Sequence, residues 1–153
     1  MEITQMTRAY VAQIAALEGQ CFADPWSERS VASELENPLS LWLVALEDGA
    51  VAGYVGSQSV LGEADMMNLA VAPAYRRRGI ARALLAALEQ ALDARQVGSL
   101  CLEVRAGNAP AIALYTACGY RQVGLRPGYY HHPREDALIL KKQWRRSNEY
   151  TGD

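Results

Sequence analysis

Arg76, Arg77, Arg78 and Gly79 concentrate positive charge where an apolar stretch gives way to a helical pattern. The preceding MMNLAV is typical of a strand, and the following residues repeat apolar side chains at helical spacing. The first turn of a helix leaves amide groups unpaired and carries partial positive charge. Glycine lets the backbone approach a ligand closely, and arginine adds forked donors. The stretch therefore predicts a site for one concentrated anion, most commonly a phosphate.

Two other interpretations of the arginines stay open from the residues alone. Runs of like charge are commonly solvated, and a solvated surface is as compatible with this stretch as a phosphate site. A nucleic-acid patch is less favoured, because the formal net charge is −2 and the pI about 5.7, whereas polyanion-binding domains are usually basic. The stretch also lacks the GK[ST] and GxGxxG patterns of nucleotide-binding loops.

Composition places the chain among ordinary globular proteins. It has 153 residues, of which 50% are hydrophobic and 21% charged, and this predicts one domain with a sizeable core. Its cysteines, Cys21, Cys101 and Cys118, are odd in number and lack metal-ligand spacing, so we expect reduced thiols and no metal site. The chain shows neither a signal peptide nor an apolar run of about 18 residues. We therefore expect a cytoplasmic protein with no membrane partner.

Capping signals mark the helices that would surround the arginine turn. Helices are predicted after residue 7 and within 24–37, 78–98 and 108–118. Thr7, Ser27 and Asn108 are the expected N-caps, because their side chains can accept from the first helical amides. Gly98 and Gly119 are expected to end the last two helices in a left-handed conformation.

Short apolar or alternating runs predict the strands. They lie at 3–6, 40–47, 50–61, 64–71, 99–107, 120–130 and 136–144. Hairpin-length connections in the first half favour antiparallel pairing. The order of elements predicts a mixed α/β fold with a mainly antiparallel central sheet flanked by helices. We expect a single domain over 1–144 and a polar tail at 145–153.

Residues 76–81, which read RRRGIA, resemble the [Q/R]xxGx[G/A] pyrophosphate loop of the GNAT acetyltransferases. The flanking NLAVAPAYR and ARALLAALEQAL are similar to the strand and helix around that loop. Ala81 stands where many members have a second glycine, and the pattern accepts alanine there. LEVRAGNAPAIALYTACGYRQVGLRPGYY, REDALIL and DPWSE resemble, within this family, the ribosomal-protein-alanine N-acetyltransferases. The resemblance covers nearly the whole chain except the C-terminal tail.

This resemblance implies the GNAT fold and acetyl-CoA as co-substrate. It also implies that strands around 66–72 and 99–105 splay apart, and that the pantetheine arm lies beside the first of them like an added strand. A backbone amide there would polarise the acetyl carbonyl. The implied acetyl-CoA site comprises Leu69, Ala70, Val71, Arg76, Arg77, Arg78, Gly79, Ile80, Ala81, Arg82 and Asn108.

The same resemblance implies that Glu103 is the general base and Tyr115 the general acid. An α-amino group with a pKa of about 8 must lose a proton before it attacks a thioester. A carboxylate can accept that proton, and a phenol can protonate the departing thiolate. The strand pattern alone favours an exposed Glu103 paired with Arg105 or with a neighbouring strand, and only the resemblance reverses this preference. Glu63 and Asp65 are rival bases.

The segment RPGYYHHPREDA is the expected substrate side of the site. Tyr129 and Tyr130 would wall a groove for an extended peptide N-terminus, and Glu135 and Asp136 would attract its positive charge. A hairpin turn with solvated charges remains an equally compatible alternative.

The resulting functional expectation is an acetyl-CoA-dependent Nα-acetyltransferase. It would act on the N-terminal alanine of a small-subunit ribosomal protein by direct transfer in a ternary complex, without a direct nucleic-acid partner. One alternative is a GNAT enzyme for lysine, a polyamine or another small amine. A second, less favoured alternative is a non-catalytic ribosome- or RNA-binding module.

Overall fold

The computed structural model describes residues 1–145, and residues 146–153 lie outside this part. Its strands are β1 (Glu2–Gln5), β2 (Ser40–Glu47), β3 (Ala50–Val60), β4 (Glu63–Val71), β5 (Ser99–Arg105), β6 (Arg121–His131) and β7 (Arg134–Gln143). Its helices are α1 (Val11–Cys21), α2 (Glu28–Ser33), α3 (Ile80–Ala94) and α4 (Ala109–Ala117), with short 3-10 turns η1 (Arg8–Tyr10), η2 (Glu34–Glu36) and η3 (Pro73–Tyr75). No helix within residues 1–145 is long and apolar enough to cross a membrane.

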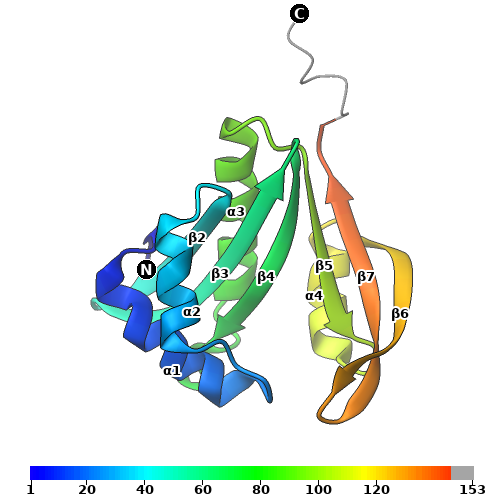
Figure 1. Cartoon of the computed structure of the whole chain (residues 1–153), viewed down its shortest axis with the longest axis horizontal. Helices are drawn as coiled ribbons and strands as arrows, with labels where there is room; N and C mark the ends of the chain where they lie inside the picture. Colours follow the sequence, from blue (N-terminus) through cyan, green and yellow to red (C-terminus); the bar gives the residue numbers. More distant parts are fainter. Residues whose placement is uncertain (146–153) are drawn as a thin grey trace, which may run out of the picture.

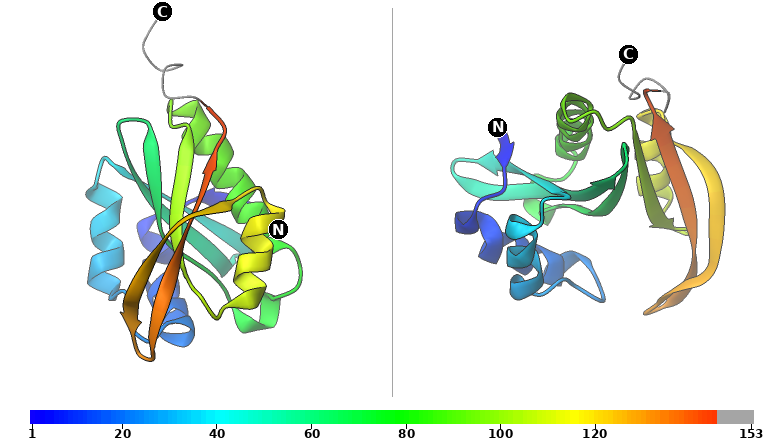
Figure 2. Two further views of the ribbon diagram at one scale, coloured as in Figure 1. Left: turned by 90° about the vertical axis from the view of Figure 1, so that its right-hand side faces the viewer. Right: turned by 45° about the horizontal axis from the view of Figure 1, so that its top comes forward.

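The strands form one seven-stranded sheet in the order β1-β2-β3-β4-β5-β7-β6. Every pair is antiparallel except β4 and β5, which run parallel. Helices α1 and α2 cover one face, and α3 and α4 cover the other (Figures 1 and 2). The predicted mixed α/β fold with a mainly antiparallel sheet is confirmed.

The alternation of side chains along β2 divides the apolar residues between two cores. Leu41 and Leu43 lie in the core under α3, whereas Trp42 and Val44 lie in the core under α1 and α2. Successive residues of a strand point to opposite faces, so an unbroken apolar strand is expected where helices cover both faces. The sheet is therefore anchored on both sides around the central strands.

Two of the three predicted N-caps form. The Ser27 hydroxyl accepts from the Ser30 amide at 3.0 Å, and the Asn108 side chain accepts from the Ala111 amide at 3.3 Å. The Thr7 prediction is wrong, because the chain first makes the η1 turn and Thr7 forms no side-chain cap. Helix α1 then starts after Tyr10.

The two predicted glycine helix ends have different outcomes. Gly119 has a φ of 96° after α4, as expected. The Gly98 prediction is wrong, because α3 ends at Ala94 and the positive φ, 67°, falls at Gln96. Gly98 instead donates its amide to the Gly62 carbonyl at 2.8 Å. Of the predicted tail, Arg145 is described and pairs with an acidic side chain of α3, while the rest lies outside the described residues.

Strands β4 and β5 pair over only a short stretch. Their ladder runs from Glu63 opposite Ser99 to Asp65 opposite Cys101. Beyond that point the strands diverge, and Figure 1 shows the widening gap between them. The splaying expected from the resemblance is therefore confirmed.

A bulge in β4 lies at the start of this divergence. Gly56 of β3 pairs with Asn68, but the next residue, Ser57, pairs with Met66. Met67 is thus an extra residue without a partner in the register. Bulges bend a strand and change its local twist, so this one redirects β4 away from β5.

A fully buried carboxylate, Glu18 of α1, joins three other segments. Its Oε1 accepts from the Trp26 amide at 2.8 Å. Its Oε2 accepts from the Asn68 side chain at 2.8 Å and from the Tyr54 hydroxyl. Burial raises the pKa of Glu18 above its ordinary value of 4.5, and the hydrogen bonds from Trp26 and Asn68 oppose this rise. The loop between α1 and α2 is thereby fastened to β3 and β4.

We expect Glu18→Gln to remove a pH dependence of stability. A raised pKa in the folded state means that this group favours folding below pH 4.5 and loses that contribution as the pH rises through the raised value. The free energy of unfolding of the wild type minus that of the variant should therefore fall over this range, by about 1.4 kcal/mol for each unit of the shift. Urea unfolding from pH 4 to 8 measures it. The exposed Glu36, changed to Gln, is the matched control, and an identical trend in both variants would contradict the assignment.

Candidate active site

The opening between β4 and β5 contains two adjoining cavities. The larger, here called the turn cavity, measures about 620 Å³ and extends from β4 to the start of α3. The smaller, the inter-strand cavity, measures about 300 Å³ and lies between β4, β5 and α4. Both are lined by Cys21, Phe22, Leu69, Asn108, Ala111 and Leu114. The shared lining makes them one continuous space.

The arginine-glycine turn forms one end of the turn cavity. Helix α3 begins directly after Gly79, whose φ of 76° lies in the left-handed region. Arg77 also has a positive φ, 65°. A Cβ at Gly79 would meet no atom within 4 Å, so the backbone conformation, not crowding, favours glycine here. Gly79, Ile80 and Ala81 line the cavity, which exposes it to the electropositive first turn of α3.

The three arginines of the turn have different surroundings. Arg77 lines the turn cavity. Arg76 also lines it, but its Nε donates to the Val71 carbonyl at 3.1 Å. Arg78 does not line the cavity, and its guanidinium lies 5.3 Å from the centre of the Tyr75 ring. Every other residue of the predicted acetyl-CoA set lines the turn cavity.

Strand β4 supplies backbone to the same space. Leu69, Ala70 and Val71 line the turn cavity. Their ladder to β3 is complete, but within residues 1–145 β4 has no ladder to β5 beyond Asp65. Backbone groups that lose a strand partner need another partner, such as water or a ligand. An extended ligand with amide groups suits this edge.

Glu103 and Tyr115 both line the inter-strand cavity. Leu102 and Val104 of β5 pack into the α3 core, so Glu103 between them points to the opposite face. Its Oε1 lies 3.3 Å from Nε of Arg126 on β6. The ion pair is therefore with β6, which β7 separates from β5 in the sheet, and not with Arg105.

Tyr115 enters the cavity from α4. Its side chain is buried, and its ring meets that of Tyr120 edge to face with centres 5.9 Å apart. Burial, with smaller contributions from Tyr130 and Cys118, raises the pKa of Tyr115 to about 12. The phenol therefore stays protonated near neutral pH and can donate a hydrogen bond or a proton.

The two rival carboxylates lie at the closed end of the opening. Asp65 is the last residue of β4 that pairs with β5. Glu63 accepts from the Lys141 ammonium at 3.1 Å. Neither lines the turn or inter-strand cavity, so the fold does not bring them together with Tyr115.

A third cavity, the loop cavity, lies between the α1–α2 loop and the β6–β7 hairpin and measures about 560 Å³. Tyr129 and Tyr130 line it, and their rings meet edge to face at 5.1 Å. Tyr130 also lines the inter-strand cavity. Burial, followed by the effect of Tyr129, raises the pKa of Tyr130 to about 12. Of the two predicted substrate-side tyrosines, Tyr130 therefore stands at the junction of the two spaces, and Tyr129 lies beside it in the loop cavity.

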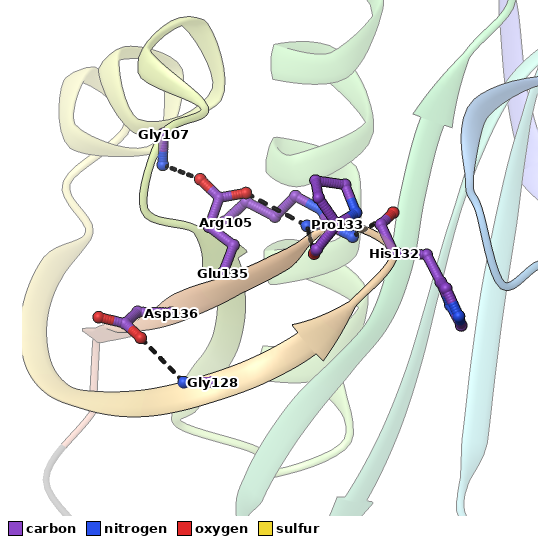
Figure 3. A network of polar contacts seen from close by, with 7 residues as sticks. All are labelled: Arg105, Gly107, Gly128, His132, Pro133, Glu135 and Asp136. Atoms are coloured by element: carbon purple, nitrogen blue, oxygen red, sulfur yellow. Dashed lines mark hydrogen bonds and ion pairs between the residues drawn. The ribbon is translucent and has the colours of Figure 1, made fainter.

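The two acidic residues predicted beside them have other partners. Glu135 accepts from the Gly107 amide at 2.6 Å and pairs with Arg105 at 3.2 Å. Asp136 accepts from the Gly128 amide at 2.8 Å (Figure 3). Neither lines the three cavities. Because both oxygens of Glu135 and one oxygen of Asp136 accept from the protein's own donors, these residues shape the hairpin and lie outside the cavity linings.

Sequence reasoning missed several lining residues. Cys21 and Phe22, at the end of α1, line all three cavities, and Met67 and Asn68 line the inter-strand and loop cavities. Cys21 and Phe22 belong to no chemical motif, and more than forty residues separate them from β4. Asn68 could not be identified from the sequence, because its contact with the buried Glu18 forms only in the folded chain.

Comparison with known proteins agrees with this geometry. A profile described as the acetyltransferase (GNAT) family matches residues 11–120. The chain is 41% identical over 143 residues to the ribosomal protein bS18-alanine N-acetyltransferase of Escherichia coli, with 92% of each protein covered. It is 38% identical over 147 residues to the N-alpha-acetyltransferase RimI of Mycobacterium tuberculosis, covering 92% of this chain and 90% of that protein.

Solved structures show the same relationship. The crystal structure of the ribosomal-protein-S18-alanine N-acetyltransferase from Escherichia coli has a TM-score of 0.88 and 36% identity, with 99% of both chains covered. The acetyl-CoA complex of Arabidopsis thaliana NAA60 has a TM-score of 0.83 at 19% identity, which shows a shared fold. The family profile, the relatives and the splayed β4–β5 opening agree, and this chain belongs to the GNAT family of acetyltransferases.

Proposed function

We propose that this protein is an acetyl-CoA-dependent Nα-acetyltransferase that modifies the N-terminal alanine of a small-subunit ribosomal protein. The names of its relatives in Escherichia coli and Mycobacterium tuberculosis support the reaction, and the former supports the acceptor. The observation that carries the proposal is the inter-strand cavity, which has Glu103 and Tyr115 in its lining and opens into the turn cavity.

The residues of the turn cavity fit acetyl-CoA. Its volume, about 620 Å³, lies in the range of small-molecule sites. The first turn of α3, with Arg77 and Arg82 beside it, offers positive charge for a pyrophosphate. The unpaired edge of β4 suits the amides of an extended pantetheine arm. When bound, acetyl-CoA supplies the activated acetyl group.

Glu103 and Tyr115 divide the proton transfers in this proposal. Glu103 takes a proton from the peptide ammonium, directly or through a water, and leaves a neutral amine. The amine nitrogen forms a bond to the acetyl carbon and gives its second proton to solvent as the amide forms, while the bond from that carbon to sulfur breaks; solvent returns a proton to Tyr115 after the transfer. Tyr115 donates its proton to the departing sulfur, and its raised pKa of about 12 keeps that proton in place until then. Direct transfer gains mainly from positioning the two substrates.

The peptide would enter through the loop cavity. Tyr129 and Tyr130 form part of its wall, and Trp26 of the α1–α2 loop lines the opposite side. Tyr130 also lines the inter-strand cavity, so the loop cavity leads to the space that Glu103 lines. Arg78 is not needed for this arrangement, and Glu135 and Asp136 contribute by shaping the hairpin.

Glu103→Gln is expected to lower kcat by about 10² or more, because it removes the proton acceptor while keeping the size of the side chain. The Kd for acetyl-CoA should change little, since Glu103 does not line the turn cavity. Steady-state kinetics and calorimetry measure the two quantities. Glu63→Gln is the control at the closed end of the strands, and an equal loss of kcat there would reassign the base.

Gly79→Val is expected to weaken acetyl-CoA binding by about tenfold. A β-branched residue at a φ of 76° is strained by about 1–2 kcal/mol, and a branched side chain would project where a phosphate approaches the turn. Titration calorimetry with acetyl-CoA measures the change. Gly19→Ala is the matched control, because a Cβ there also meets no atom within 4 Å and no left-handed φ is required. Unchanged affinity in the valine variant would exclude the turn as the phosphate site.

The acceptor is tested by offering acetyl-CoA with two peptides of equal length and charge. One has a free N-terminal alanine, and the other has a blocked N-terminus and one internal lysine. We expect mass spectrometry to find acetyl on the alanine nitrogen, because the groove leads an extended N-terminus towards Glu103. Preferential lysine modification would replace the proposed acceptor with a side-chain amine. RNA binding without release of CoA would instead favour a non-catalytic module.

A further inference from the structure

The guanidinium of Arg105 holds the tip of the β6–β7 hairpin at several points. Its Nη1 donates to the Pro133 carbonyl at 2.8 Å, and its Nη2 donates to the His132 carbonyl at 3.2 Å. The same Nη1 pairs with Glu135 at 3.2 Å. The guanidinium also lies over the ring of Tyr130, 4.3 Å from its centre. Figure 3 shows the polar contacts converging on the hairpin tip.

Glu135 extends these contacts to a second segment. Its other oxygen accepts from the Gly107 amide at 2.6 Å, in the connection between β5 and α4. A Cβ at Gly107 would lie 2.5 Å from that oxygen, so the close approach depends on glycine. The next residue, Asn108, caps α4 and lines the turn and inter-strand cavities. The Arg105–Glu135 pair thus joins the hairpin tip to the framework of the inter-strand cavity.

The held residues are those that border the proposed acceptor path. Tyr130 lines both the loop and inter-strand cavities, and His132 and Pro133 line the loop cavity. Arg105 itself follows Glu103 by two residues on the same face of β5. Arg105 and Glu135 each expose 27% of their side chains, so solvent screens their attraction less than that of a fully exposed pair. The fork of arginine suits this set of two carbonyls and one carboxylate.

We propose that Arg105 and Glu135 are positioning residues that hold the hairpin tip, and Tyr130 in particular, where the acceptor peptide passes towards Glu103. The inference rests on the proposed N-terminal acetyltransferase function. Neither residue takes part in proton transfer. Their contribution is a preformed groove, which lowers the ordering cost that the peptide would otherwise meet on binding.

Two variants loosen the hairpin tip from opposite sides. Glu135→Gln can keep an oxygen for the Gly107 amide but loses the charge opposite Arg105. Arg105→Lys keeps the charge but lacks the fork that reaches both carbonyls. In each variant we expect the KM for the alanine-starting peptide to rise about tenfold, with kcat at saturating peptide and the Kd for acetyl-CoA nearly unchanged. The double variant should be no worse than the more affected single variant, because both remove one interaction.

Asp93→Asn is the matched control, because it removes a carboxylate of α3 that pairs with Arg145 at 2.8 Å, away from the three cavities. Its peptide KM should equal that of the wild type. An unchanged peptide KM in both loosened variants would overturn the proposal. So would a rise in the acetyl-CoA Kd as large as the rise in peptide KM, because that would indicate general damage to the site.

Limited trypsin digestion tests the same inference without any acetyl transfer. We expect cleavage after Arg134, at the hairpin tip, to be faster in Arg105→Lys than in the wild type and Asp93→Asn; Glu135→Gln is left out because it changes the residue that follows the scissile bond. Equal rates in these three proteins would overturn the proposal. If the wild type prefers a lysine acceptor, the proposed function fails. The comparison of KM values for that acceptor, together with the digestion, would still decide whether the Arg105–Glu135 pair holds the hairpin tip.

Discussion

The early end of the β4–β5 ladder is the constraint on which the rest of this structure depends. Two parallel strands pair over three positions, and then the bulge at Met67 bends β4 away. A sheet that stops pairing in its middle leaves backbone groups without partners and opens a space between its halves. The turn cavity and the inter-strand cavity both occupy that space. The site is therefore a consequence of interrupted pairing and not of a separate binding loop.

This opening brings together groups from opposite faces of the sheet. Glu103 lies on the face of β5 opposite the α3 core, whereas Tyr115 comes from α4, which covers the same face of the sheet as α3. A continuous sheet would keep a carboxylate and a phenol placed in this way apart. The parting of the strands lets both line one cavity, with the first turn of α3 at its far end. The positive charge of the arginine-glycine turn, the Glu103 carboxylate and the Tyr115 phenol thus lie at distinct places along one continuous space.

Polar contacts of the buried Glu18 and of the partly exposed Arg105 and Glu135 fix the two loops that border the loop cavity. Glu18 ties the α1–α2 loop to β3 and β4, and Arg105 with Glu135 ties the β6–β7 hairpin to the end of β5. Loops carry recognition well only when rigid elements hold them. Both ties use a charged group with several partners, which specifies one geometry more closely than apolar packing does. The groove walls are in this way continuous with the sheet.

The sequence by itself determined the order of the elements, the caps at Ser27 and Asn108, and the glycine turn before α3, because these depend on neighbouring residues and on periodicity. The resemblance to GNAT enzymes correctly indicated the splayed strands, and it named residues that line one opening. Tertiary structure alone decided that Arg78 lies on Tyr75, that Glu103 pairs with Arg126, and that Glu135 and Asp136 bind backbone amides. Those outcomes depend on contacts between segments far apart in the chain, and the missed ends at Thr7 and Gly98 were likewise set by neighbouring turns and strands.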